Sequence, residues 1–275
     1  MSREACQTGQ VKIRLVATDL DGTFFGPDHR PQARTVAALN ALQSAGVICA
    51  AVTGRSHMRG APLATSTGAE FDWFIGSNGG HRLNLRTREI EERLTFGDGA
   101  VVDARASLEA AMPDIAFGYE SGDRLVWDPG FIDLYPTRLG GDLGEEDLRG
   151  DGSTPTGVGK MLIAHPVHGN RELIDLVEPH FTDGVHVTSS GIDFVEATPP
   201  GGTKGAALAR LCARLDIVPE EVIAFGDNLN DLTMIEWAGR GVAMGNAEEA
   251  VKDIADEVTS TNAEFGVARI LEELV

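Results

Sequence analysis

The sequence predicts an α/β protein: a three-layer α/β/α core built on a parallel sheet, with an α+β unit inserted into it. Two observations support this. Over residues 13–76, apolar stretches alternate with amphipathic helical stretches, which is typical of parallel strands joined by right-handed crossovers. This alternation stops in the middle third and resumes after Pro199-Pro200-Gly201-Gly202. We therefore expect a core of residues 1–84 and 198–275 and an inserted unit of residues 85–197.

The first part of the core is expected to alternate strictly between strand and helix. Its elements are a strand at 13–20, a helix at 31–46, a strand at 47–52, a helix at 56–66 and a strand at 71–76. Pro31 suits the first turn of a helix, and Val36, Leu39 and Leu42 share one face of that helix.

The strand–helix alternation stops at the polar, alternating stretch 81–94, which predicts a hairpin. Beyond it we expect a helix at 98–112, strands at 115–119, 124–127 and 158–164, a helix at 170–181 and a closing hairpin of 185–189 with 192–197. The Gly-rich, acidic stretch 136–159 predicts a long exposed loop, in which 142–151 would form a solvated acidic face.

The last part of the core restores the strand–helix alternation. Its expected elements are a helix at 203–215, a strand at 222–225, a helix at 229–238, a strand at 241–244, a helix at 247–255 and a terminal helix from about 265.

Composition excludes several classes of protein. The net charge of −19 argues against a nucleic-acid or membrane-surface binder, and an anionic substrate would need a locally built site. The cysteines, Cys6, Cys49 and Cys212, are too few for a disulfide framework or a zinc site, and the seven histidines lack ligand-like spacing. No apolar run approaches the roughly 20 residues that cross a bilayer, so we expect a cytoplasmic protein.

The first motif with candidate catalytic residues is Asp19-Leu20-Asp21-Gly22-Thr23, at the end of the first strand. Two carboxylates two positions apart repel each other unless a cation lies between them. Three further polar motifs are expected at the same edge of the sheet or at a helix start: Thr53-Gly54-Arg55, Thr203-Lys204-Gly205 and Gly226-Asp227-Asn228-Leu229-Asn230-Asp231.

These motifs offer carboxylates, a hydroxyl group and a lysine, a set that suits Mg²⁺ better than zinc or iron. Gly22 and Gly54 would let backbone N–H groups approach an anion closely. A carboxylate beside Mg²⁺ can attack phosphorus, and a second carboxyl group can protonate the leaving oxygen.

In this order, the four motifs resemble those of the haloacid dehalogenase-like (HAD) phosphatases, and the resemblance covers the whole core. The position and pattern of the insertion resemble the Cof-type (IIB) subgroup, whose inserted cap is of the C2B kind. Asn78-Gly79-Gly80 lies where that subgroup usually has Asn-Gly-Ala, and Phe24-Phe25 replaces a more usual aliphatic pair.

The resemblance implies a role for each motif residue. Asp19 would be the nucleophile and a Mg²⁺ ligand, and Asp21 the general acid/base with its backbone carbonyl on the metal. The remaining roles are phosphoryl binding by Thr53 and Lys204, metal ligation by Asp227, contact with the phosphoryl group or metal-bound water by Asn230, and orientation of the site by Asp231. Gly22, Gly54 and Arg55 would lie beside the phosphate.

Each residue also has a plainer interpretation. Thr53 could form a turn, Lys204 could be a solvated lysine, and Asp227 and Asp231 could be loop or cap acids. Arg55 could contact substrate or form a structural salt bridge. Asn78 could face the substrate or simply form a turn.

We therefore expect a Mg²⁺-dependent phosphatase that hydrolyses a phosphomonoester of a small metabolite, by default a sugar phosphate, through an aspartyl-phosphate. The alternatives are a phosphomutase or phosphotransferase on the same fold, a flavin or pyridoxal phosphate phosphatase, and a non-catalytic binding protein. The sequence does not give the oligomeric state.

Overall fold

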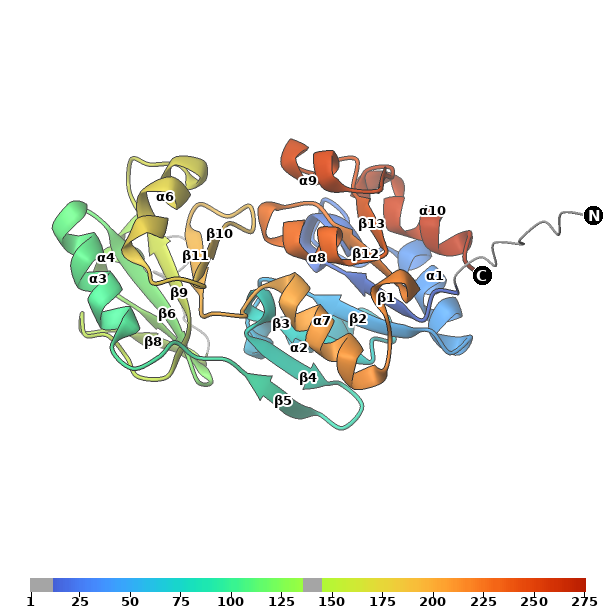
Figure 1. The fold of residues 1–275 in the computed structure, drawn as a ribbon, viewed down its shortest axis with the longest axis horizontal. Helices are drawn as coiled ribbons and strands as arrows, with labels where there is room; N and C mark the ends of the chain where they lie inside the picture. The colour runs from blue at the N-terminus through green and yellow to red at the C-terminus, as the bar shows by residue number, and fades with distance from the viewer. Residues whose placement is uncertain (1–11, 136–144) are drawn as a thin grey trace, which may run out of the picture.

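The structure is a computed structural model that describes residues 12–135 and 145–275. Within these residues the strands form two sheets, which Figure 1 shows side by side. The eight-stranded sheet contains β1 (Leu15–Thr18), β2 (Ile48–Val52), β3 (Trp73–Gly76), β4 (His81–Asn84), β5 (Glu89–Arg93), β12 (Val222–Gly226), β13 (Arg240–Ala243) and β14 (Glu257–Val258). The six-stranded sheet contains β6 (Ala116–Ser121), β7 (Arg124–Trp127), β8 (Asp147–Arg149), β9 (Val158–Ala164), β10 (His186–Thr188) and β11 (Val195–Thr198).

The helices are distributed between the two sheets. Those with the eight-stranded sheet are α1 (Ala33–Ser44), α2 (His57–Ser66), α7 (Lys204–Leu215), α8 (Leu232–Trp237), α9 (Glu249–Ile254) and α10 (Gly266–Glu272). Those with the six-stranded sheet are α3 (Ala100–Ala111), α4 (Pro129–Leu134) and α6 (Asn170–Val177). No helix of the described residues is long and apolar enough to cross a membrane.

The eight-stranded sheet has the strand order β14-β13-β12-β1-β2-β3-β4-β5. Strands β14 to β3 are parallel, whereas β4 and β5 form an antiparallel hairpin at the edge. Right-handed crossovers lead from β1 through β2 to β3 in one direction and from β12 through β13 to β14 in the other, so α1 and α2 cover one face and α8 and α9 the other. Helix α10 packs on α1, and α7 packs on α8. The predicted α/β core is therefore confirmed.

Burial explains why the sequence alternates as it does. Every residue of β1 and β12 is buried, because helices cover both faces of the sheet. The helices contribute one apolar face each, for example Leu39 and Leu42 in α1.

The six-stranded sheet has the order β10-β11-β9-β6-β7-β8, and only β7 and β8 pair in parallel. Side chains alternate between its two faces. Phe117 packs with apolar residues of α3 and α6 on one face. Trp127, Phe131 and Phe194 cluster on the other face, which carries α4 and reaches Met58 of α2. This second face therefore looks towards the eight-stranded sheet.

The predicted boundary after residue 84 is wrong, because it falls inside the eight-stranded sheet. Strand β4 pairs with β3, and β5 (Glu89–Arg93) pairs with β4 at the edge. The polar pattern that indicated a new unit arises because β5 is largely solvent-exposed. The division of the chain into two independent domains remains a prediction.

The predicted loop at 136–159 is also partly wrong, although residues 136–144 lie outside the described part of the chain. Asp147–Arg149 form β8. The Asp147 carboxylate is buried, and it accepts hydrogen bonds from Trp127 Nε1 at 2.6 Å and Arg59 Nη2 at 2.5 Å. This acid therefore belongs to the packing against β7 and not to a solvated face.

The first strand is shorter than expected at its carboxyl end. Strand β1 ends at Thr18, and Leu20–Phe24 curl into a turn in which Phe24 N donates to Asp19 O at 3.2 Å. Gly22 has φ +84°, a left-handed conformation that glycine adopts without strain. The turn carries the chain out of the sheet directly after Asp19.

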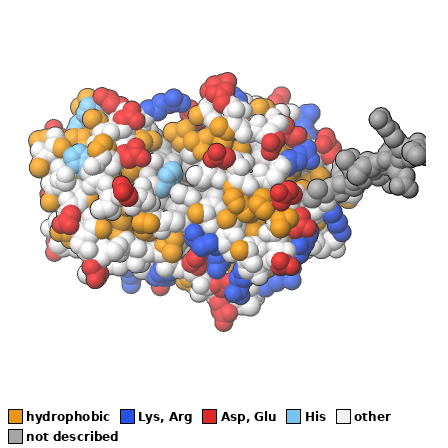
Figure 2. Space-filling model, viewed as in Figure 1, with side chains coloured by type: hydrophobic (Ala, Val, Ile, Leu, Met, Phe, Trp, Pro, Cys, Tyr) orange, Lys and Arg blue, Asp and Glu red, His pale blue; other side chains and the backbone are white. Residues whose placement is uncertain are grey.

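The surface is mixed in charge. On the face shown in Figure 2, acidic and basic side chains are interspersed with apolar ones, although the formal net charge is −19.

Candidate active site

The predicted motifs meet at one edge of the eight-stranded sheet. Asp19 follows β1, Thr53 follows β2 and Asp227 follows β12, and these three strands are neighbours. A cavity of about 370 Å³ opens at this edge. Its walls include the predicted residues Asp19, Asp21, Thr53, Gly54, Arg55 and Asn230. This edge lies at the carboxyl ends of parallel strands, where α/β sheets bind ligands.

Lys204 joins two carboxylates beneath the cavity. Its Nζ lies 2.7 Å from Asp19 Oδ1 and 2.6 Å from Asp231 Oδ1, and its side chain is fully buried. Lys204 is the first residue of α7, after Thr203, whose side chain accepts a hydrogen bond from Ala206 N. The interpretation of Lys204 as a solvated lysine is therefore wrong.

Gly205 allows this approach, because a Cβ there would overlap the backbone carbonyl of Thr233. The start of α7 can therefore lie close to α8, and Lys204 extends to Asp19.

Both carboxylate oxygens of Asp231 accept hydrogen bonds from other groups of the protein. Its Oδ1 accepts from Lys204, and its Oδ2 accepts from the backbone N–H groups of Asp227 and Asn228 at 2.9 and 3.0 Å. It thus serves as the cap acid that one interpretation expected and also orients Lys204.

The site holds more negative charge than its lysine neutralises. Burial raises the pKa of Asp19 well above its usual range, against the opposing charge of Lys204, and Asp231 and Asp227 raise it further. Burial, with the negative charge of Asp231, raises the pKa of Asp227 to about 7. A cation between these carboxylates would remove this repulsion.

The donor set fits a hard divalent cation. Ligand atoms of Asp19, Asp227 and Asp231 all lie within 4.8 Å of one another. Because the oxygens of Asp231 are already bonded, Asp19 and Asp227 are the carboxylates that could hold a metal ion. Asp227 is itself oriented by Thr23 Oγ1, which donates to its Oδ1 at 2.5 Å.

Gly22 packs directly on Asp227. A Cβ at this position would overlap the Asp227 carboxylate. The glycine therefore fixes how closely the turn after β1 approaches the acid that follows β12.

Asp21 lies further along the turn and is paired with Arg55. Arg55 donates from Nε to Oδ2 at 2.6 Å and from Nη2 to Oδ1 at 2.7 Å, and His29 Nδ1 lies 3.4 Å from Oδ1. Burial alone would raise the pKa of Asp21, but the hydrogen bonds and charge of Arg55 outweigh it and lower that pKa. Arg55 is thus in a salt bridge while its side chain also lines the cavity.

Thr53 and Gly54 form the turn after β2. Thr53 is buried, its backbone N donates to Ile75 O, and its Oγ1 accepts from Arg55 N at 3.2 Å. Gly54 O accepts from Lys160 Nζ at 2.7 Å. The hydroxyl of Thr53 therefore forms a turn and lies at the cavity wall.

A buried polar chain crosses from this edge to the six-stranded sheet. Asn230 Nδ2 donates to Asn78 Oδ1 at 2.9 Å, and Asn78 Nδ2 donates to Glu196 Oε2 at 3.1 Å. Lys160 Nζ lies 2.8 Å from Glu196 Oε1. Asn78 has φ +57°, so it forms the expected turn and also links Asn230 to Glu196.

Sequence reasoning missed Lys160 and Glu196. Lys160 is the one charged residue of β9, Glu196 lies between Val195 and Ala197 in β11, and both charged side chains are buried. A charge in such a position costs free energy unless it is paired, and that was the available signal.

The far wall of the cavity is apolar and was also missed. It comes from the six-stranded sheet and its loops, and it consists of Leu125, Trp127, Phe131, Ile192 and Phe194. Phe131 and Phe194 meet edge to face, with ring centroids 5.4 Å apart. One end of the cavity therefore carries charged groups and the other carries aromatic side chains.

Comparisons with known proteins agree with this arrangement. A sequence model of haloacid dehalogenase-like hydrolases matches residues 16–125 and 144–271. The chain is 29% identical to the 5-amino-6-(5-phospho-D-ribitylamino)uracil phosphatase YcsE of Bacillus subtilis, over 98% of each protein. It is 30% identical to the HMP-PP phosphatase of Yersinia enterocolitica, over 94% of each. A solved HAD subclass IIB sugar phosphatase shares the fold, with a TM-score of 0.79, 22% identity and coverage of 95% of this chain and 100% of that one.

Proposed function

Since the chain belongs to the haloacid dehalogenase-like hydrolases and is a phosphatase of the Cof-type (IIB) subgroup, we propose that it hydrolyses a phosphomonoester of a small metabolite with Mg²⁺, through an aspartyl-phosphate on Asp19. A cytoplasmic location remains part of the same prediction.

The observation that carries the proposal is the buried contact between Lys204 Nζ and Asp19 Oδ1 at 2.7 Å, beside a cavity that Asp19 lines. Lys204 occupies Oδ1, so Oδ2 is the oxygen that would attack phosphorus. A protein that only binds a ligand would have no need of a buried carboxylate oriented in this way.

Asp19, Asp227 and the backbone carbonyl of Asp21 would hold the Mg²⁺ ion. When bound, the ion supplies positive charge that offsets these carboxylates and the phosphate. Lys204 adds a further positive charge beside the phosphoryl group, and Thr53 and Asn230 would bind its oxygens.

Two steps complete the reaction. Asp19 Oδ2 forms a bond to phosphorus as the bond to the leaving oxygen breaks, and Asp21 gives that oxygen a proton. Asp21 then takes a proton from the water that attacks the aspartyl-phosphate, which releases inorganic phosphate and restores Asp19.

The apolar wall favours one class of leaving group over the sugar phosphate that we expected by default. Trp127, Phe131 and Phe194 line this end of the cavity with aromatic side chains, on which a heterocycle packs better than a bare sugar. The uracil ring in the name of the Bacillus subtilis relative is such a group. We therefore rank phosphates of heterocyclic metabolites, flavin and pyridoxal phosphates included, above sugar phosphates.

Release of inorganic phosphate from a panel of both kinds of substrate tests the proposal. Hydrolysis should require Mg²⁺ and disappear in Asp19→Asn. Activity without Mg²⁺, or full activity in that variant, would contradict the mechanism. Phosphate that appears mainly on a second substrate molecule would identify a phosphotransferase or mutase instead.

The substrate ranking is tested separately with Phe194→Ala. This variant should raise KM for heterocyclic substrates and leave KM for sugar phosphates unchanged, because only the former reach the aromatic wall. An equal effect on both classes would overturn the ranking.

A further inference from the structure

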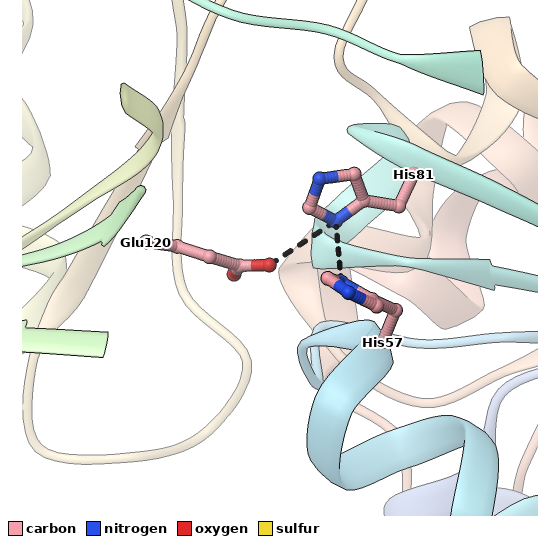
Figure 3. A group of neighbouring side chains, drawn as sticks. All are labelled: His57, His81 and Glu120. Carbon is pink, nitrogen blue, oxygen red and sulfur yellow. Dashed lines mark hydrogen bonds and ion pairs between the residues drawn. The ribbon is translucent and has the colours of Figure 1, made fainter. Parts of the chain in front are cut away.

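A second polar cluster lies where the two sheets meet. His57 begins α2, His81 begins β4, and Glu120 lies in β6 of the six-stranded sheet; all three are at least nine-tenths buried. Figure 3 shows both imidazole rings and the carboxylate converging. His57 Nδ1 lies 3.3 Å from His81 Nδ1, which lies 3.1 Å from Glu120 Oε1.

The hydrogen bonds of His57 determine which of its two ring nitrogens carries the proton and which has a lone pair available for a metal ion. Its Nε2 lies 3.0 Å from Asp123 Oδ1, and the same oxygen accepts from Arg93 Nη2 at 2.6 Å. A carboxylate oxygen only accepts, so Nε2 of neutral His57 carries the proton. Nδ1 therefore presents a lone pair to His81, and a carboxylate behind a histidine in this way is typical of metal ligands.

The separations match those of a metal site. In a tetrahedral zinc site with ligands about 2.0–2.1 Å from the ion, neighbouring ligand atoms lie about 3.3 Å apart. Two of the three separations in this cluster are 3.3 and 3.1 Å, and all three ligand atoms lie within 4.8 Å of one another. Two imidazoles and one carboxylate select zinc-like transition metals over Mg²⁺.

We infer that His57 Nδ1, His81 Nδ1 and Glu120 Oε1 form a Zn²⁺ site, separate from the Asp19–Asp227 site. The ligands come from α2 and β4 on one side and β6 on the other, so the ion would join the two sheets. This inference does not rest on the proposed phosphatase reaction.

The rival arrangement is a metal-free hydrogen-bonded cluster. In it, Ser77 Oγ donates to Glu120 Oε1 at 2.5 Å, and His81 Nδ1 carries a proton. The two arrangements differ in whether His81 Nδ1 has a lone pair, and zinc binding distinguishes them directly.

The test is calorimetric titration of Zn²⁺ into chelator-treated protein in saturating Mg²⁺, with the metal content measured by elemental analysis. We expect one tightly bound zinc ion per chain. Glu120→Gln and His57→Ala should abolish this binding. With Co²⁺ in place of Zn²⁺, the visible absorption of a tetrahedral site should appear in the parent and be absent from Glu120→Gln.

Asp123→Asn keeps the test informative if a buried variant does not fold. The Asp123 side chain is 69% exposed, so its replacement should leave the fold intact, and losing the carboxylate behind His57 should weaken zinc binding by about 10- to 100-fold. His165→Ala is the matched control, because it removes a histidine from the His165–His168 pair and should leave zinc affinity unchanged.

Two results would overturn the inference. One is the absence of bound zinc in Mg²⁺-saturated parent protein. The other is zinc that survives in Glu120→Gln and Asp123→Asn but is lost in Asp227→Asn, which would locate the ion at the carboxylates near Lys204.

Discussion

Arg55 holds both carboxylate oxygens of Asp21, from Nε at 2.6 Å and from Nη2 at 2.7 Å. A bidentate pair of this kind fixes a carboxylate in one orientation and keeps it ionised. In the proposed reaction Asp21 carries a proton, and that reaction therefore requires the pair to loosen when substrate binds. Arg55 lines the cavity and could then turn to the phosphate.

Replacing Asp21 with Asn removes the acid/base group and leaves the backbone carbonyl in place. We expect kcat to fall by about 10²- to 10⁴-fold, the usual contribution of a positioned acid/base group, with Mg²⁺ affinity unchanged. Steady-state phosphate release and calorimetry measure the two effects. Arg55→Lys cannot form the bidentate pair with Asp21, and it should lower kcat by a smaller factor. Parental kcat in Asp21→Asn would remove Asp21 from the mechanism.

Gly22→Ala should weaken Mg²⁺ binding, because a Cβ at this position displaces Asp227. Gly46→Ala is the matched control: its φ is +89° against +84° at Gly22, and a Cβ there meets nothing within 4 Å. Each substitution should lower the free energy of unfolding by roughly 1–2 kcal/mol through backbone strain. Only the change at Gly22 should lower Mg²⁺ affinity in calorimetry, and equal affinities would refute this account.

Lys204→Met leaves Asp19 and Asp231 buried without their shared cation. In Mg²⁺-free buffer we expect the free energy of unfolding to fall by about 3–5 kcal/mol, as measured by urea denaturation. Adding Asp231→Asn should restore part of that loss, since one uncompensated charge disappears. Neither variant should release phosphate. If the double variant is no more stable than Lys204→Met, repulsion is not the cause.

His186 in β10 should make stability depend on pH. Burial lowers its pKa below the usual value, against the opposing charge of Glu178. The unfolded chain then binds more protons than the native chain as pH falls through about 6.5, so native stability decreases there. Denaturant titrations at several pH values should show less of this decrease in His186→Gln. Identical pH profiles would contradict the assignment.

The grouping of the motifs that follow the parallel strands was predictable from sequence for a physical reason. Buried parallel strands leave a near-continuous apolar signature, and their carboxyl ends must meet at one edge. Asp19, Thr53 and Asp227 could therefore be placed together from the sequence alone. The role of Lys204 came only from the resemblance, because nothing local in the sequence marks a helix-start lysine as buried.

The remaining contacts depend on how the two sheets face each other. His57 and His81 are 24 positions apart, and Glu120 lies on another sheet, so no spacing rule would have joined them. Glu196 and Trp127 reach the cavity through the orientation of β11 and β7, which strand propensity does not determine. The polar pattern of β5 led to the wrong boundary for a related reason. An edge strand of a sheet and a hairpin on the surface show the same alternation of polar and apolar residues.

The pairing of β1 with β12 also constrains how the protein is made. Thr23 and Asp227, which hydrogen-bond across these strand ends, are 204 positions apart in the chain. During synthesis, β1 therefore keeps one unpaired edge until most of the polypeptide has left the ribosome. The six-stranded sheet draws all its strands from one continuous stretch and can assemble earlier. The site around Asp19 is thus among the last parts of the molecule to form.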